Sequence, residues 1–167
     1  MTQEIKTKYT LGIVGGTGKE GKGLAYRRLL AGHKVNIGSR QFEKAQRAVD
    51  ELVEFMGYKP EGLQGMDNQA AVEACDLAVI AVPYSAHKTT LEDLRDVLQG
   101  KIVIDVVVPI VPPKVTKVQM PQAGSVAQEA QAMLGDACQV VDAFQNISYE
   151  RLMGQGDADC DVLVCGK

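Results

Sequence analysis

The chain lacks several features that would direct it to a membrane or out of the cell. Its 167 residues include no tryptophan, two histidines and few aromatic side chains. No stretch approaches the roughly 18–20 consecutive apolar residues that a membrane-spanning helix requires. The first ten residues, MTQEIKTKYT, lack the apolar centre of a signal peptide. We therefore expect a cytoplasmic protein that is neither exported nor partnered with a membrane.

Basic clusters and metal-ligand spacings are also missing. The net charge is −3 and no run is rich in lysine or arginine, whereas nucleic-acid-binding domains carry basic patches. We therefore expect no nucleic-acid partner. The cysteines form no CxxC pair; they are Cys75, Cys138, Cys160 and Cys165. With so few histidines, the sequence predicts no metal site and indicates reduced, largely buried thiols.

Short apolar runs alternate with helix-like segments along the chain. The strand-like runs are 9–14, 33–38, 61–67, 75–83, 101–113, 138–144 and 160–166, and the helix-like segments are 19–31, 41–57, 68–74, 84–100 and 125–135. The almost wholly apolar run 75–83 is typical of a central parallel strand covered on both faces. This order predicts an α/β fold with a doubly wound, mainly parallel sheet and helices on both faces, in one domain over residues 1–167.

A glycine-rich segment follows the first strand-like run. Gly16, Gly18 and Gly21 match G-x-G-x-x-G between a strand and a helix, which is the context in which this pattern indicates a Rossmann-type dinucleotide site. Glycine permits the tight turn, the approach of the backbone to a pyrophosphate and close packing of helix on strand. The helix start then offers N–H groups to the phosphates. The alternative is a glycine-rich turn without a ligand; a Walker P-loop is excluded because no G-K-[ST] follows.

The end of the second strand indicates which dinucleotide binds. Ser39 lies 21 positions after Gly18 (39 − 18), where an acidic residue would favour NAD and an arginine NADP. The chain has Ser39 and Arg40 there, and Lys44 stands one helical turn further on. Arginine can fork two donors onto a phosphate. Although these cations would also suit a solvated helix start, basic residues there oppose the helix dipole, so the sequence favours NADP over NAD.

These segments resemble a known enzyme family. LGIVGGTGKEGKGLAYRRLLAGHKVNIGSRQFEKA is similar to the NADPH-dependent coenzyme F-420 reductases, also called coenzyme F-420:NADP oxidoreductases. GMDNQAAVEACDLAVIAVPYSAH, KIVIDVVVPI and CDVLVCG resemble the same family, so the resemblance covers nearly the whole chain. It implies hydride transfer between NADP(H) and the deazaflavin coenzyme F-420 (also written F420), with this small molecule as co-substrate.

The resemblance also implies roles for individual cofactor-binding residues. Those that would contact the pyrophosphate, beside Gly16, are Thr17, Gly18, Lys19 and Glu20. Those that would hold the 2′-phosphate are Ser39, Arg40 and Lys44. Val82 and Pro83 would lie beside the nicotinamide, and the loop at Pro109 would border the deazaflavin site.

The chain departs from the family pattern in three places. Gln145 stands where the family has a histidine, Tyr84 stands where it has a tryptophan, and the chain ends at Lys167 before the family's C-terminal helical segment, which contributes to the coenzyme pocket and the dimer. No acid–base pair is evident, and hydride transfer between two cofactors needs none. The candidates for a catalytic role are His87, which otherwise occupies a surface or capping position, and Gln145.

Two other functions remain open at this stage. One is an NADP-dependent reductase of another small acceptor, such as an imine, a keto acid or a pterin-like molecule. The other is a non-catalytic protein that senses NADP(H). The same nucleotide site would serve all three functions, because a fold does not fix an activity. The sequence also leaves open whether the chain forms a homo-oligomer.

Overall fold

A seven-stranded sheet runs through the computed structural model, which describes residues 7–111, 113 and 117–166. Six strands are parallel, and the seventh pairs antiparallel to β6 through Asp142–Cys165 and Ala143–Val164. The strands are β1 (Thr10–Val14), β2 (Lys34–Ser39), β3 (Leu63–Asp67), β4 (Leu77–Ile80), β5 (Ile102–Asp105), β6 (Gln139–Ala143) and β7 (Val164–Cys165).

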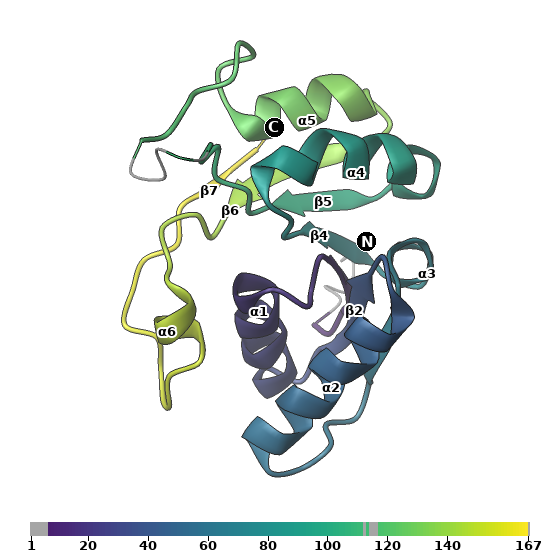
Figure 1. The fold of residues 1–167 in the computed structure, drawn as a ribbon, viewed down its shortest axis with the longest axis vertical. Coiled ribbons are helices and arrows are strands. Elements are labelled where there is room, and N and C mark those ends of the chain that lie inside the picture. Colours follow the sequence, from purple (N-terminus) through teal and green to yellow (C-terminus); the bar gives the residue numbers. More distant parts are fainter. Residues whose placement is uncertain (1–6, 112, 114–116, 167) are drawn as a thin grey trace, which may run out of the picture.

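Helices cover both faces of this sheet (Figure 1). They are α1 (Lys19–Leu30), α2 (Phe42–Met56), α3 (Asn68–Glu73), α4 (Tyr84–Leu98), α5 (Val126–Leu134) and α6 (Tyr149–Leu152). One apolar cluster joins α1 and α2 to the sheet, and a second joins α3, α4 and α5 to its other face. Successive side chains of a strand point to opposite faces of the sheet, so Ile13 belongs to the first cluster and Val14 to the second.

The strand order places a crevice beside β1. The order is β3-β2-β1-β4-β5-β6-β7, and its first six strands follow the doubly wound Rossmann arrangement. The predicted fold class is therefore confirmed. The chain leaves β1 in one direction to β2 and crosses to β4 on the other side, so the carboxyl ends of β1 and β4 flank the point at which the order reverses. Ligands bind outside the strand ends at such a point.

Three predicted strands are much shorter than their apolar runs, and one of them, the run 160–166, is extended only over β7. The run 75–83 is extended only over β4, and the run 101–113 leaves the sheet after Asp105. The Asp105 carboxylate causes the second break, because its Oδ1 accepts a hydrogen bond from the Val107 N–H at 3.0 Å and turns the chain. Within the strand predicted over residues 101–113, residue 112 lies outside the described residues.

Helix α6 was not predicted, because its four residues carry no helical period. It is capped by Ser148, whose Oγ accepts a hydrogen bond from the Arg151 N–H at 3.4 Å. Over the described ranges, no helix has both the length and the apolar character needed to cross a membrane.

Candidate active site

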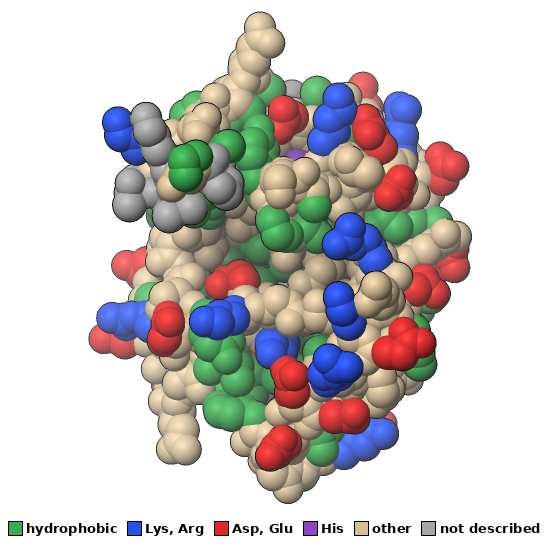
Figure 2. All heavy atoms as spheres, viewed as in Figure 1, with side chains coloured by type: hydrophobic (Ala, Val, Ile, Leu, Met, Phe, Trp, Pro, Cys, Tyr) green, Lys and Arg blue, Asp and Glu red, His purple; other side chains and the backbone are tan. Residues whose placement is uncertain are grey.

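A groove of about 590 Å³ opens at the carboxyl ends of β1, β2 and β4. It brings together seven of the predicted cofactor-binding residues: Thr17, Gly18, Ser39, Arg40, Lys44, Val82 and Pro83. Gly15, Gln41, Asn68, Ala81, Ala86 and Thr90 complete the lining. Figure 2 shows this face of the molecule hollowed near its centre, with lysine and arginine side chains beside the hollow.

The glycine loop forms the floor of the groove. Gly15 has φ +73°, and a Cβ there would lie 2.7 Å from Val82 Cγ1, so only glycine fits. Helix α1 begins after Gly18 with no side-chain cap, which leaves its first N–H groups for a ligand or water. A Cβ on Gly21 would lie 2.7 Å from Gly16 Cα. Gly16 and Gly21 therefore bring helix and loop together, and neither lines the groove.

A cationic corner lies where β2 passes into α2. Arg40 and Lys44 are exposed on the groove wall, and neither forms a salt bridge with any carboxylate in the described part of the chain. Ser39 is buried, and its Oγ accepts a hydrogen bond from the Gln41 N–H at 3.3 Å. The Ser39 hydroxyl proton therefore remains available to a ligand. This corner offers three donors to an anion at the edge of the groove.

Asn68 contributes a polar atom that the sequence did not assign to the site. Its Oδ1 is buried and has no hydrogen-bond partner among the described residues, while Asp67 caps α3 by accepting from the Ala70 N–H at 2.8 Å. Leaving a buried acceptor unsatisfied costs about 1–3 kcal/mol. A donor from a bound molecule would satisfy it.

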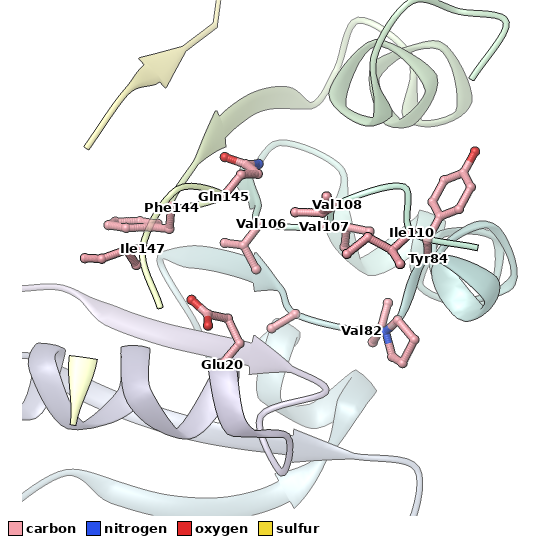
Figure 3. A pocket seen from close by; sticks show the side chains of 12 residues that line it. Glu20, Val82, Tyr84, Val106, Val107, Val108, Ile110, Phe144, Gln145 and Ile147 are labelled. Atoms are coloured by element: carbon pink, nitrogen blue, oxygen red, sulfur yellow. The ribbon is translucent and has the colours of Figure 1, made fainter. Parts of the chain in front are cut away.

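A second pocket of about 390 Å³ adjoins the groove. The two share three wall residues, Ala81, Val82 and Pro83, which follow β4. Figure 3 shows the other lining side chains, which are mostly apolar: Glu20, Tyr84, Val106, Val107, Val108, Ile110, Phe144, Gln145 and Ile147. A ligand in the groove and one in the pocket would therefore meet at the β4 end.

Phe144, in the wall of this pocket, has an unusual backbone conformation. It has φ +74° and is the one non-glycine residue in the described ranges with a positive φ. Such a conformation costs of order 1–3 kcal/mol and persists where the surroundings require it. The turn directs the chain from β6 into the pocket wall, so that Phe144, Gln145 and Ile147 all line it. No sequence pattern marked Phe144, because φ is not encoded by residue type alone.

Predicted residues Lys19 and Glu20 do not line the groove. The Lys19 ammonium lies 5.9 Å from the centre of the Tyr149 ring, and Glu20 lines the second pocket. Successive helical side chains point about 100° apart, so residues at the start of α1 cannot all face the phosphates. The Glu20 carboxylate would also repel a pyrophosphate. The roles implied by the resemblance are thus supported by position for Thr17 and Gly18 but not for these two residues.

A hydrogen-bonded network lies behind the second pocket. Gln145 Nε2 donates to the Asp105 carbonyl oxygen at 2.7 Å and to the Asp142 carboxylate. Burial, with a smaller contribution from nearby Asp105, raises the pKa of Asp142 above its ordinary value. Asp105 Oδ2 lies 2.7 Å from His87 Nε2, and both side chains are fully buried. The network fixes the backbone turn at the pocket wall.

His87 is neither on the surface nor in contact with the groove or pocket. The His87 side chain, which extends from α4, is 1% exposed. It pairs with the Asp105 carboxylate at the end of β5. His87 is therefore found neither at the substrate site nor at the surface, the two positions expected from the sequence. The face of α4 that carries it is packed against β5. Gln145, the other catalytic candidate, does line the pocket. No cluster of three or more potential metal ligands occurs within the described ranges.

Comparisons with known proteins show which sequences the chain resembles. The family model described as "NADP oxidoreductase coenzyme F420-dependent" matches residues 10–109. The F420-dependent NADP reductase of Methanocaldococcus jannaschii is 37% identical over 164 residues, covering 93% of this chain and 72% of the relative. That of Methanothermobacter thermautotrophicus is 36% identical over 159 residues, covering 92% and 68%.

A solved structure shares the fold at lower identity. A putative F420-dependent NADP reductase from Arthrobacter sp. FB24 superimposes with a TM-score of 0.71 at 22% identity, covering 95% of this chain and 74% of that one. A pyrroline-5-carboxylate reductase from Streptococcus pyogenes reaches 0.61 at 15% identity, covering 97% and 50%. The family match and the two curated relatives confirm the resemblance seen in the sequence, and the chain belongs to the coenzyme F420-dependent NADP oxidoreductase family.

Proposed function

We propose that the chain is an oxidoreductase that transfers hydride between NADPH and the deazaflavin coenzyme F-420. One observation carries this proposal: the groove and the second pocket share Ala81, Val82 and Pro83 as a common wall. Two ligands that meet at this wall can bring their reacting rings together, which is the main requirement of hydride transfer. The curated relatives that match nearly the whole chain carry the name F420-dependent NADP reductase, and this supports the same pair of substrates.

The groove residues suit NADP(H). The glycine loop leaves no room for a Cβ at Gly15, and the start of α1 offers uncapped N–H groups for a pyrophosphate. Arg40 and Lys44 are unpaired within the described part of the chain and lie where a ribose 2′-phosphate would reach. Ser39 adds a hydroxyl donor. The proposed nicotinamide contacts are Val82 and Pro83.

The protein's contribution to the reaction is orientation and exclusion of water. Bound NADPH would supply the hydride and the deazaflavin would receive it. The second pocket is walled by apolar side chains from three separate segments, among them Val106, Ile110 and Phe144. Such walls hold a flat ring in place and keep water from the reacting atoms. No residue need act as acid or base during the transfer itself.

An assay with two nucleotides and one acceptor tests the proposal. Purified protein is mixed with NADPH or NADH, and coenzyme F-420 is added while the absorbance of nicotinamide and deazaflavin is recorded. We expect both absorbances to change together with NADPH and far more slowly with NADH. Binding of NADPH without oxidation would instead favour another small acceptor or an NADP(H)-sensing role.

We also propose a cytoplasmic protein with a single domain over residues 1–167 that associates with itself. The continuous sheet supports the single domain, and four free cysteines are typical of a reducing compartment. Leu163 and Val164, at the sheet edge formed by β7, are 70% and 65% exposed. Exposed apolar side chains at a sheet edge favour contact with a second copy.

A further inference from the structure

Glu20 occupies an unusual position for an acidic residue. It lies in the first turn of α1, directly after the glycine loop, yet its side chain lines the second pocket among apolar groups such as Val106 and Ile147. Figure 3 shows its carboxylate rising from α1 toward the space bounded by these side chains. The residue as a whole is half-buried, but burying one carboxylate oxygen without a partner is unfavourable.

The structure gives the inner oxygen of this carboxylate no partner. Glu20 Oε1 is buried and accepts no hydrogen bond from any described residue. Burial, with a smaller contribution from the Glu150 carboxylate, raises the pKa of Glu20 above its ordinary value. A buried unsatisfied oxygen in a native pocket requires an explanation, such as a ligand that satisfies it.

Gln145 offers a second acceptor to the same pocket. Its Nε2 donates to two acceptors within the protein, the Asp105 carbonyl oxygen and the Asp142 carboxylate. Neither of these groups can donate to it while Asp142 is ionised, so the amide nitrogen must face them. The carbonyl oxygen is therefore the end of the Gln145 amide that is left for a ligand in the pocket, which this side chain lines.

The hydroxyl of Tyr84 does not change this polarity, because it donates to Glu129 at 3.2 Å. No lysine or arginine stands among the described residues that line the pocket. The pocket thus presents acceptor oxygens in an apolar setting. A carboxylate or phosphate of a ligand would be repelled, and a group with an N–H or O–H donor would be bound.

We propose that Glu20, aided by the Gln145 carbonyl, selects the acceptor molecule by accepting a hydrogen bond from a donor on its ring, such as the imide N–H of a deazaflavin. The inference rests on the proposed function, since it assigns the second pocket to the hydride acceptor. It makes Glu20 a determinant of acceptor specificity. It also places the anionic tail of coenzyme F-420 outside this pocket.

A pair of ligands that differ in one donor tests the inference. Wild-type protein with saturating NADP⁺ is titrated with 5-deazariboflavin and with its N3-methyl derivative, and binding is followed by ligand fluorescence. A hydrogen bond to a charged group contributes about 1.5–3 kcal/mol, so methylation should weaken binding by roughly 10- to 150-fold. In Glu20→Leu, which keeps the side chain's size, the two ligands should bind within about twofold of each other.

Two further measurements make the outcome decisive. The matched control is Glu43→Leu, which removes an exposed glutamate from the corresponding first turn of α2 and should preserve the difference between the ligands. Equal binding of the ligands to wild type, a difference that persists in Glu20→Leu, or binding of neither ligand would overturn the inference. NADPH oxidation by 5-deazariboflavin is measured in parallel. If the two ligands differ in affinity in a way that depends on Glu20 but NADPH is not oxidised, the inference is supported and the proposed function is rejected. If NADPH is oxidised but the two ligands bind equally, the proposed function is supported and the inference is rejected.

Discussion

Arg40 and Lys44 retain an uncompensated charge at the start of α2, where the helix dipole disfavours cations. Helix α2 has no side-chain cap at Gln41, and neither cation has an ion-pair partner in the described ranges. These residues were predictable from sequence, because the end of β2 and the first turn of α2 are local features that follow directly on one another. An anionic ligand would remove the conflict between dipole and charge.

Replacement of Arg40 by alanine should weaken NADPH binding selectively. Charge-assisted hydrogen bonds contribute about 1.5–3 kcal/mol, which corresponds to a loss of roughly 10- to 150-fold in affinity for NADPH. Affinity for NADH, which lacks the 2′-phosphate, should change by less than about threefold. Fluorescence titration with both nucleotides measures this, with the exposed Arg47→Ala as control. Equal losses for both nucleotides would reject the 2′-phosphate assignment.

Glu20 should make stability depend on pH. Its pKa is raised above the ordinary value of 4.5 by burial and by Glu150, so the folded state binds its proton more tightly than the unfolded state does. The contribution of Glu20 to stability should therefore fall as pH rises from 4.5 through the raised pKa. Glu20→Gln removes this contribution. Urea unfolding across this pH range should show that the free energy of unfolding of Glu20→Gln rises relative to that of the wild type as pH increases. A difference between the two proteins that does not change with pH would contradict the account.

At the scale of elements, α4 is attached to β5 by a pair that sequence inspection cannot reveal. His87 and Asp105 are 18 residues apart and both fully buried, and Asp105 also holds the turn at Val107. The sequence marked His87 only as a candidate catalytic residue and gave no sign of its pairing with Asp105, because the pair forms only when the helix packs on the sheet. The same is true of the second pocket, whose walls come from the start of α1, the segment after β4, the segment after β5 and the turn after β6.

Breaking this pair should destabilise the protein, and a second substitution should recover part of the loss. His87→Leu leaves the Asp105 carboxylate buried without its partner, which costs about 3–5 kcal/mol. Adding Asp105→Asn removes the unpaired charge and keeps an oxygen for the Val107 N–H. We therefore expect urea unfolding to show the double variant more stable than His87→Leu alone. Exposed Lys88→Ala is the control, and failure of the second substitution to recover stability would argue against the pairing.

At the scale of the whole molecule, Arg27 ties the C-terminal part of the chain to the first helix. Its guanidinium donates to the carbonyl oxygens of four residues between 2.6 and 2.9 Å: Arg151, Leu152, Gly154 and Gly156. Leu152 in turn packs on Gly23, where a Cβ would lie only 2.8 Å from Leu152 Cβ. The segment after β6 thereby closes one side of the second pocket.

Arg27→Ala should loosen this segment while sparing the nucleotide groove. The lost hydrogen bonds join a charged donor to backbone carbonyls, so we expect the free energy of unfolding to fall by about 2 kcal/mol. Hydrogen exchange of the amides of Leu152 and Met153 should accelerate, and NADPH affinity should stay within about twofold. Mass spectrometry of exchange and a nucleotide titration test both. Unchanged exchange in residues 149–156 would show that Arg27 does not hold the segment.

The parts that sequence reasoning recovered share one property. The strand–loop–helix unit at Gly16–Gly21, the NADP corner at Arg40 and the alternation of elements are all short-range patterns. The parts it missed depend on tertiary packing: the rotation of α1 that turns Glu20 away from the groove, the burial of His87 and the turn at Phe144. Family resemblance supplied the substrates but did not indicate that the side chains of Lys19 and Glu20 lie outside the groove, because a motif does not specify which way a helix presents each side chain.

The central claim is that one molecule holds both rings at the wall formed by Ala81, Val82 and Pro83, so that hydride passes directly between them. The most direct measurement uses NADPH carrying deuterium at the transferable position of C4, mixed with coenzyme F-420 and the protein in ordinary water. Mass spectrometry of the reduced deazaflavin reports where the label went. The account predicts deuterium retained at the reduced carbon, one per NADPH consumed. Unlabelled product, or NADPH bound and left unoxidised, would contradict it.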